Sequence, residues 1–242
     1  MTSVHVIFGA TGGIGSALAR RLAARGDSVL LAARDAAKLD ALATELAAVP
    51  VTVDAADFAD VDRVMDLARE RFGRVDGVAN CVGSLLLKPA HLTKAEEFQA
   101  TIAANLTSAF AVVRSAARVM PEGGSVVLCS SSAARIGLAN HEAIAAAKAG
   151  VLGLVLSAAA TYGSRGLRVN AVAPGLVQTP LTARITASAT AAEGSRAMHA
   201  LGRLGAPDDV ASLMAWLMGP ESSWVTGQCY GVDGGLGTVR SK

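Results

Sequence analysis

The stretch VHVIFGATGGIGSALARRL, residues 4–22, carries the strongest structural signal in this sequence. The apolar run Val4–Phe8 predicts a buried strand, and a helical pattern follows directly after a glycine-rich turn. Glycines in such a turn let the backbone approach a pyrophosphate, and the helix N-terminus offers unpaired N–H groups and a positive dipole end. We expect Gly9 to make the turn, Gly13 to face the phosphates and Gly15 to let the helix pack closely on the strand. The turn therefore predicts a dinucleotide site built from Gly9, Thr11, Gly12, Gly13, Ile14 and Gly15.

Short apolar runs continue to alternate with longer helical patterns along the rest of the chain. Strands that are buried on both faces have this nearly continuous apolar character. The β-α-β order predicts an α/β fold of the Rossmann type: a single domain, residues 1–242, with a doubly wound parallel sheet of about seven strands and helices on both faces. The expected strands are Val4–Phe8, Ser28–Ala32, Val51–Val53, Gly77–Ala79, Ser125–Cys129, Arg168–Val172 and Gln228–Val232. The expected helices are Ile14–Arg25, Ala36–Ala48, Val61–Phe72, Glu96–Met120, Asn140–Tyr162 and Pro207–Leu217.

The composition excludes several classes of protein. Of the 242 residues, 52% are hydrophobic and only 17% are charged, which excludes a disordered, solvated chain. A net charge of +2 without a polybasic run, and 4% aromatic residues, argue against a nucleic-acid partner. The three cysteines and four histidines lack metal-ligand spacing, so we expect a reduced, cytoplasmic protein without a metal site. The uncharged stretch 149–164 is too short for a membrane span, and the start of the chain has no export pattern, so no membrane partner is expected.

The end of the second expected strand bears on the choice of coenzyme. A carboxylate there would bond the ribose 2′-hydroxyl of NAD(H) and repel a 2′-phosphate. This sequence has Arg34 instead, and a guanidinium can fork onto a phosphate and stack on adenine. We therefore expect NADP(H) rather than NAD(H). Two alternatives stay open, because Arg34 could be an ordinary loop residue and Asp35 could reach the ribose.

Four further motifs follow in the order expected of one family. They are Asn80-Cys81-Val82-Gly83, the segment 170–175 with Thr179 after it, the segment 202–210, and Val232-Asp233-Gly234-Gly235. With the glycine-rich turn, they give a chain that resembles the short-chain dehydrogenase/reductase family over essentially its whole length. The resemblance implies that Asp54 meets the adenine ring and that the Pro-Gly segment borders the nicotinamide. Beyond the turn, the expected coenzyme-binding residues are Arg34, Asp54, Ala55, Asn80, Cys81, Val82, Gly83, Lys148, Pro174, Gly175, Val177 and Thr179.

The same resemblance implies a catalytic set and shows one departure from it. Asn105, Ser131 and Lys148 match the family's helix asparagine, catalytic serine and lysine. The family's Tyr-x-x-x-Lys motif reads Ile144-Ala145-Ala146-Ala147-Lys148 here, so the phenol that exchanges the proton is absent from its place. General acid–base help is typically about 10²–10⁴-fold in rate, whereas hydride transfer belongs to the coenzyme. The departure weakens the case for catalysis without ending it.

Two substitutes for the missing proton donor stay open. His141, Ile144 and Lys148 are spaced by three and four residues, so they share one helical face, and Asn140 is the expected N-cap of that helix. His141 titrates near neutrality and could donate the proton, or it could merely line the pocket or face solvent. A water relayed through Asn105 and Lys148 is the other source. Ser131 is expected to hold a carbonyl oxygen, the alternative being that residues 130–132 simply cap the end of their strand.

Together these features predict an NADP(H)-dependent oxidoreductase of the short-chain dehydrogenase type. It would reduce a small or medium, uncharged carbonyl compound or oxidise the alcohol. The alternative is a catalytically weak or inactive NADP(H)-binding protein with a regulatory or structural role. We expect residues 176–206, rich in alanine, serine and threonine, to form a mobile flap over the site rather than an ordinary surface excursion. The two long helices resemble those that build the family's oligomers, so a homo-oligomer, a dimer or tetramer, is expected.

Overall fold

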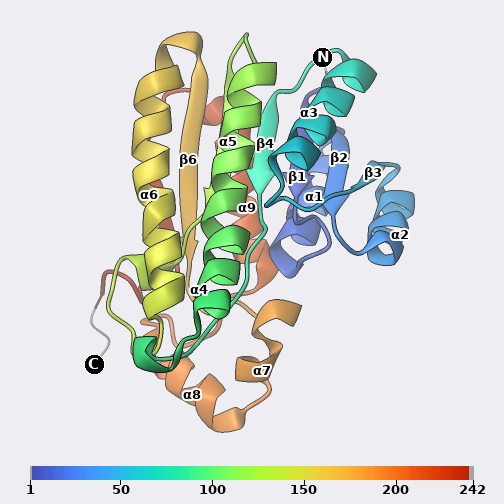
Figure 1. The fold of residues 1–242 in the computed structure, drawn as a ribbon. Helices are drawn as coiled ribbons and strands as arrows, with labels where there is room; N and C mark the ends of the chain where they lie inside the picture. The colour runs from blue at the N-terminus through green and yellow to red at the C-terminus, as the bar shows by residue number, and fades with distance from the viewer. Residues whose placement is uncertain (1, 240–242) are drawn as a thin grey trace.

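Seven parallel strands form the centre of the molecule, in the order β3-β2-β1-β4-β5-β6-β7 (Figure 1). The structure is a computed structural model that describes residues 2–239. The strand order reverses between β1 and β4, and crevices at such points bind ligands in open α/β sheets. The strands are β1 (Val4–Phe8), β2 (Ser28–Ala33), β3 (Val49–Thr52), β4 (Gly77–Asn80), β5 (Gly124–Cys129), β6 (Leu167–Pro174) and β7 (Cys229–Val232).

Helices cover both faces of this sheet, as Figure 1 shows. One face carries α1 (Gly13–Ala24), α2 (Ala36–Leu46) and α9 (Pro207–Met218), whose buried residues form one hydrophobic cluster. The other face carries α3 (Phe58–Phe72), α5 (Ser108–Val119) and α6 (Glu142–Tyr162), whose buried residues form a second cluster. The shorter helices are α4 (Ala95–Ile102), α7 (Ala183–Thr186) and α8 (Ala189–Met198). The prediction of a doubly wound Rossmann-type fold in one domain is confirmed.

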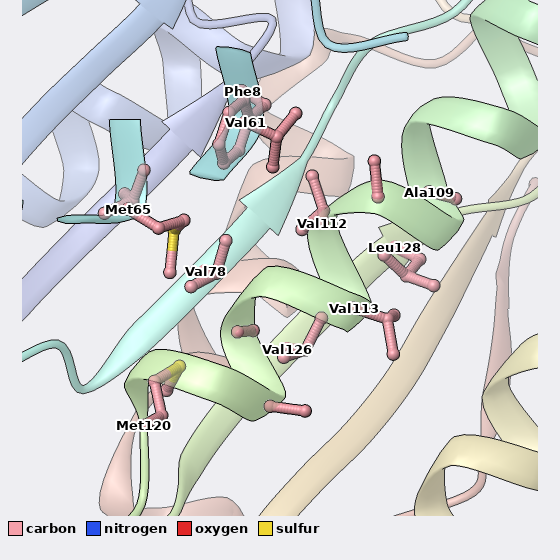
Figure 2. Packing of buried hydrophobic residues seen from close by; sticks show 14 of the residues in the cluster. Phe8, Val61, Met65, Val78, Ala109, Val112, Val113, Met120, Val126 and Leu128 are labelled. Atoms are coloured by element: carbon pink, nitrogen blue, oxygen red, sulfur yellow. The ribbon is translucent and has the colours of Figure 1, made fainter. Parts of the chain in front are cut away.

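The second cluster shows how the sequence pattern makes the layers (Figure 2). Phe8, Val78 and Val126 are fully buried on neighbouring strands, and Val112 of α5 packs over them. Each apolar side chain of this size stabilises the fold by about 1.5–3 kcal/mol when it is fully buried. Because the strands are apolar on both faces, the polar residues of the site are left to the strand ends.

Helix α3 begins at Phe58 rather than at Val61, most other expected bounds differ by one or two residues, and two expected helices differ in ways that bear on the site. The stretch expected as one helix from Glu96 to Met120 consists of α4, a π-helical turn at Ala103–Thr107, and α5. The helix expected to begin at Asn140 begins at Glu142, with His141 as its N-cap. Asn140 has a positive φ of 63° and lies in the preceding turn, so its prediction as N-cap is wrong. A π-turn leaves the hydrophobic pattern almost unchanged, which is why sequence periodicity did not reveal it.

Helix α6 with the turn after it, Glu142–Arg165, is long and apolar enough by length and composition to cross a membrane. In the fold it lies beside β6 (Figure 1) and also contacts α5, and 44% of the apolar window is buried within the chain. Val151 and Val155 belong to the buried cluster on that face. Packing against the sheet accounts for the apolar character of its inner side.

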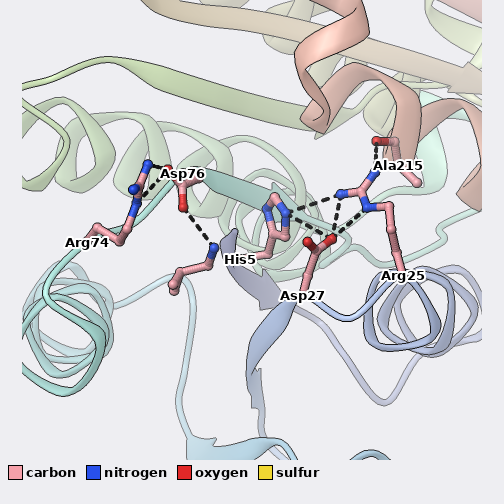
Figure 3. A network of polar contacts seen from close by, with 7 residues as sticks. His5, Arg25, Asp27, Arg74, Asp76 and Ala215 are labelled. Atoms are coloured by element: carbon pink, nitrogen blue, oxygen red, sulfur yellow. Dashed lines mark hydrogen bonds and ion pairs between the residues drawn. The ribbon is translucent and has the colours of Figure 1, made fainter. Parts of the chain in front are cut away.

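A partly buried polar network lies at the amino ends of β1 and β2, opposite the edge where the strands end (Figure 3). The ring of His5 is 1% exposed, with Nε2 3.4 Å from Asp27 Oδ2 and 3.3 Å from the Arg25 guanidinium. Arg25 also binds Asp27 and the Ala215 carbonyl, and Nδ1 of His5 has no hydrogen-bond partner among the described residues. Burial, opposed by Asp27 and aided by Arg25, lowers the pKa of His5 to about 4.

We expect His5 to make the fold sensitive to acid. Since its pKa is lower in the folded chain than the unfolded value of about 6.5, the unfolded state takes up the proton first. The free energy of unfolding therefore falls between about pH 6.5 and pH 4, by about 3 kcal/mol in total. Urea unfolding at a series of pH values should show this slope in the wild type and a flatter curve in His5→Leu. His91→Leu, at an exposed histidine, is the control; an unchanged slope in His5→Leu would contradict the assignment.

Candidate active site

The glycine-rich turn lies where β1 ends, beside the point at which the strand order reverses. Gly9 has a φ of +74°, and a Cβ there would lie 2.8 Å from the backbone of Cys81 and Val82. A Cβ on Gly15 would collide with the Gly9 carbonyl oxygen. Helix α1 begins at Gly13 without a side-chain cap, so its first N–H groups have no side-chain acceptor. The turn thus has the conformation and the free donors that an anion site requires.

Thr179 and Gly13 are distant in sequence and meet in the structure. A Cβ on Gly13 would lie 2.7 Å from Cγ2 of Thr179, so the segment after β6 packs directly on the first turn of α1. Thr182 fixes that segment, because its hydroxyl accepts from the Thr179 backbone N–H at 3.1 Å. Two motifs singled out from the sequence are therefore parts of one wall.

The residues after β2 are arranged to favour a cation. Asp35 is the N-cap of α2, where its carboxylate accepts from the Lys38 backbone N–H and pairs with the Lys38 ammonium at 2.8 Å. These contacts with Lys38 lower the pKa of Asp35. Arg34 is exposed and makes no hydrogen bond or ion pair with any residue from 2 to 239. The end of β2 therefore presents a free guanidinium beside a carboxylate that already has a counter-ion.

Residues after β3 and β4 continue the same edge. Asp54 is exposed and accepts from the Ala56 N–H at 3.0 Å, and Ala55 beside it is buried. Asn80, at the end of β4, is 2% exposed and bonds Ser108 and the Val82 N–H, which holds the turn that follows. These bonds fix the backbone from Asn80 to Gly83 against the glycine-rich turn.

Asn105 is placed by the π-turn between α4 and α5. It is 1% exposed, and its Nδ2 donates to Ser84 Oγ at 3.0 Å and to the Thr101 carbonyl at 2.9 Å. Its Oδ1 accepts from the Ser84 N–H at 3.3 Å. A Cβ on Gly83 would lie 3.0 Å from this Oδ1 and 3.5 Å from Lys148 Nζ. The absence of a side chain at Gly83 therefore keeps the space between the amide and the ammonium open.

Lys148 is a buried cation with few partners. It is 7% exposed, and its Nζ donates to the Cys129 carbonyl at 2.8 Å. Within residues 2–239 no carboxylate forms an ion pair with it, and burial lowers its pKa. An ammonium carries three donors and a buried one is costly without partners, so this group is suited to bind ligand oxygens.

Ser131 and His141 line the same cavity. Ser131 Oγ accepts from the Ala133 N–H at 3.1 Å and lines the pocket, whereas the hydroxyls of Ser130 and Ser132 are buried on the Lys148 carbonyl and on Asp233. His141 Nδ1 lies 2.7 Å from the Ala139 carbonyl. When Nδ1 carries its proton toward that carbonyl, Nε2 is left for other partners. Ile144, 4% exposed, lies between His141 and Lys148 on the same helical face.

These groups surround one cavity of about 640 Å³. Its polar groups are few, and apolar side chains make most of the wall. Residues 176–206 form one side through α7 and α8, with Leu181, Ile185 and Met198 in the lining. The cavity brings together Ile14, Cys81, Val82, Gly83, Asn105, Ser131, His141, Lys148, Pro174, Gly175, Val177 and Thr179. Arg34, Asp54 and Ala55 do not line it and lie further along the strand ends. The other predicted coenzyme residues that do not line it are Gly9, Thr11, Gly12, Gly13, Gly15 and Asn80, of which Thr11 and Gly13 line a second cavity of about 940 Å³.

Two residues of the site were missed by the sequence reasoning. His199 is 3% exposed; its Nε2 accepts from the Leu176 N–H at 3.2 Å and its Nδ1 lies 2.6 Å from the Ser195 carbonyl. A Cβ on Gly175 would strike this ring, so His199 ties α8 to the segment after β6. Cys129 also lines the cavity, next to Cys81. Cys129 could have been found from the sequence, because it is the last residue of an expected strand.

Comparisons with known proteins match the chain over nearly its whole length. A family model described as enoyl-(acyl carrier protein) reductase matches residues 9–237. The chain is 37% identical over 242 residues to 3beta-hydroxysteroid dehydrogenase 1 of Eggerthella lenta, covering 96% of this chain and 92% of that one. The solved short-chain type dehydrogenase/reductase from Mycobacterium ulcerans superposes with a TM-score of 0.94 at 32% identity, over 99% and 91% of the two chains. A variant of actinorhodin polyketide ketoreductase with NADPH gives 0.93 at 28% identity, over 98% of each chain.

Proposed function

Because the chain belongs to the short-chain dehydrogenase/reductase family, whose related members are oxidoreductases acting on carbonyls and alcohols, we propose that it reduces an uncharged carbonyl compound with NADPH or oxidises the corresponding alcohol. The observation that carries the proposal is the Lys148 ammonium, buried with a single carbonyl partner and directed into the same cavity as Ser131. A ribose diol would supply the oxygen acceptors that this ammonium lacks.

The residues of the carboxyl edge fit a nicotinamide dinucleotide. The uncapped start of α1 would hold the diphosphate, Arg34 the 2′-phosphate, Asp54 the adenine and Lys148 the nicotinamide ribose. Residues 80–83 and the wall of Pro174, Gly175, Val177 and Thr179 would border the nicotinamide. When bound, the coenzyme supplies the hydride. Ser131 would hold the substrate oxygen, and Asn105 would keep the backbone beside Lys148 in place.

Arg34 supports NADP(H) over NAD(H), since Asp35 is engaged with Lys38 and α2. A structural relative bears NADPH, which agrees with this choice. We expect Arg34→Ala to weaken NADPH binding by about 10–100-fold, because it removes a charge-assisted hydrogen bond, and to leave NADH binding unchanged. Calorimetric titration with both coenzymes measures this, with Arg71→Ala, at an exposed arginine on α3, as the control. An equal loss for NADH and NADPH would show that Arg34 does not read the 2′-phosphate.

We propose His141 as the proton donor in place of a phenol, since Ile144 stands beside Lys148 where the family's tyrosine is expected. His141→Ala should lower kcat by at least about 10²-fold and remove the pH dependence of kcat that this group causes. If a water near Asn105 and Lys148 supplies the proton instead, the rate and the pH profile will stay as they are. Ile144→Tyr is the companion variant, and a rise in activity would show that the cavity has kept the geometry a phenol needs.

The substrate we propose is small to medium in size and uncharged. The wall of the cavity is mostly apolar. The hydroxysteroid dehydrogenase among the relatives is named for an apolar substrate class. We propose that residues 176–206 act as a flap that excludes water, with α8 tied down through His199. The free cysteines support a reducing cytoplasm as the location.

A homo-oligomer, either a dimer or a tetramer, is part of the proposal. Phe98, Phe110 and Leu156 are large apolar residues on α4, α5 and α6 that are 40%, 49% and 63% exposed. Burial of such side chains between copies would stabilise the assembly. Light scattering that gives the mass of one chain would contradict it.

A second candidate is a coenzyme-binding protein without significant turnover, which the buried Ile144 favours because it cannot exchange a proton. Consumption of NADPH over a panel of aldehydes, cyclic ketones, a steroid ketone and a ketoacyl thioester distinguishes the two. The same samples are titrated with NADPH while nicotinamide fluorescence is recorded. Turnover of any substrate supports the oxidoreductase. Tight binding without consumption anywhere in the panel supports the second candidate, and absence of binding contradicts both.

A further inference from the structure

Two cysteines lie side by side at the carboxyl ends of neighbouring strands. The last paired residues of β4 and β5 are Asn80 and Leu128, so Cys81 and Cys129 follow directly, one on each strand. Both side chains pack against the hydrophobic cluster on the α1 and α9 face, and both line the cavity. Neighbouring strands lie about 4.8 Å apart, within the Cα separation of about 4.4–6.8 Å that a disulfide spans. Both thiols are free and half-buried.

The surroundings make the two thiols unequal. Contact with the Cys81 thiol and the nearby Lys148 ammonium lower the pKa of Cys129. Contact with Cys129 and burial raise the pKa of Cys81 well above its usual range. Lys148 Nζ lies against the Cys129 carbonyl at 2.8 Å, so its positive charge is adjacent to the more acidic thiol. Since the thiolate is the reactive form, Cys129 is placed to react first and Cys81 to resolve the product.

We propose that Cys81 and Cys129 form a reversible disulfide when the protein meets hydrogen peroxide, and that this oxidation closes the coenzyme site. The Cys129 thiolate attacks one peroxide oxygen, the O–O bond breaks, and Cys129 becomes a sulfenic acid as one water leaves. The Cys81 sulfur then attacks Cys129 Sγ, the S–O bond breaks, and the second water leaves. Two thiols and one hydrogen peroxide give one disulfide and two waters, and a dithiol reductant reverses the change.

The disulfide would act on the coenzyme site through two backbone contacts. The Cys81 backbone lies against the Gly9 turn so closely that a Cβ on Gly9 would be 2.8 Å away. The Cys129 carbonyl holds the Lys148 ammonium. Drawing the two strand ends together moves both contacts, one beside the proposed diphosphate site and one at the proposed ribose site. This part rests on the proposed function, and by linkage bound coenzyme should disfavour the disulfide at equilibrium.

Cys229 supplies a matched control within the same chain. It lies on β7, packs against the other hydrophobic cluster and does not line the cavity, and burial raises the pKa of its thiol. Peroxide treatment of the reduced wild type, followed by thiol titration after denaturation, should lower the titre from three thiols to one. In Cys229→Ser the titre should fall from two to none. Cys129→Ser and Cys129→Ala should form no intramolecular disulfide, and peptide mapping should find Cys81 linked to Cys129 in the wild type.

Three outcomes would overturn the proposal: a titre that stays at three, a disulfide that includes Cys229, or a thiol loss in a Cys129 variant as large as that of the wild type. Coenzyme binding is measured separately, by NADPH fluorescence on reduced, oxidised and re-reduced wild type. Oxidised wild type should lose NADPH binding and regain it after reduction. The Cys129→Ala variant should bind NADPH with the same affinity before and after peroxide treatment. Reduced wild type that fails to bind NADPH would contradict the proposed function and leave the disulfide standing. If NADPH still binds after complete disulfide formation, only the proposed closure of the site would be contradicted.

Discussion

Replacement of Lys148 by methionine is expected to lower kcat/KM by at least about 10²-fold while leaving the chain folded. The variant would lose the two charge-assisted hydrogen bonds that the ammonium is proposed to donate to ribose oxygens, each of about 1.5–3 kcal/mol. A loss of about 1.4 kcal/mol corresponds to a tenfold decrease in rate or affinity. Stability should move the other way. Removal of a buried cation that has one carbonyl partner, in favour of an apolar chain of similar length, is expected to be neutral or stabilising by about 1–4 kcal/mol.

The opposite signs make the Lys148→Met variant informative. Urea unfolding measures the stability, and NADPH titration with steady-state kinetics measures coenzyme binding and kcat/KM. Lys94→Met, at an exposed lysine that does not line the cavity, should change neither. A Lys148→Met protein that binds NADPH as tightly as the wild type would show that the ammonium has only a structural role, whatever its stability.

Gly9→Ala is expected to abolish coenzyme binding and to destabilise the fold by about 1–3 kcal/mol, which lowers Tm by several degrees. Two costs add at this position. The φ of +74° disfavours any Cβ, and the new methyl group would lie 2.8 Å from the backbone of Cys81 and Val82, which cannot move independently of β4. Displacement of that backbone opens the turn where the diphosphate is proposed to bind.

Gly26→Ala separates the two costs. Gly26 has a φ of +86°, but a Cβ there would meet nothing within 4 Å. This variant should therefore lose about 1 kcal/mol from the backbone conformation alone and keep full NADPH affinity. Thermal unfolding and fluorescence titration of the two variants together measure the difference. Equal behaviour of Gly9→Ala and Gly26→Ala in both assays would contradict the close approach at the turn.

The fold could be predicted from the sequence because its strands are apolar on both faces and alternate with helical patterns. That pattern fixes a parallel sheet, and a parallel sheet fixes which strand ends meet at one edge. Several residues of the site lie at the carboxyl end of a strand or face one, so their convergence could be expected. They are the glycine-rich turn, Asn80, Ser131, Lys148 and Thr179.

What the sequence did not reveal depends on single side chains and on local backbone. The π-turn that places Asn105 alters one hydrogen-bonding step without changing the apolar pattern. Helix α6 begins after Asn140 because that residue has a positive φ. Asparagine is a favourable N-cap residue, and the residue type alone does not show this backbone conformation. His199 lies in a segment of weak periodicity, and its two backbone partners come from different elements. The pairing of Asp35 with Lys38 likewise depends on the positions of single side chains, since Asp35 could have reached the ribose.

The π-turn at Ala103–Thr107 also limits how the protein can be engineered. Thermostabilising redesign favours regular helices, and deletion of one residue from this turn would restore the ordinary ladder. At 3.6 residues per turn, that deletion would rotate α4 against α5 by about 100°. Asn105 would then leave its partners Ser84 and Thr101, so a gain in helix regularity at this joint would be made at the expense of the site.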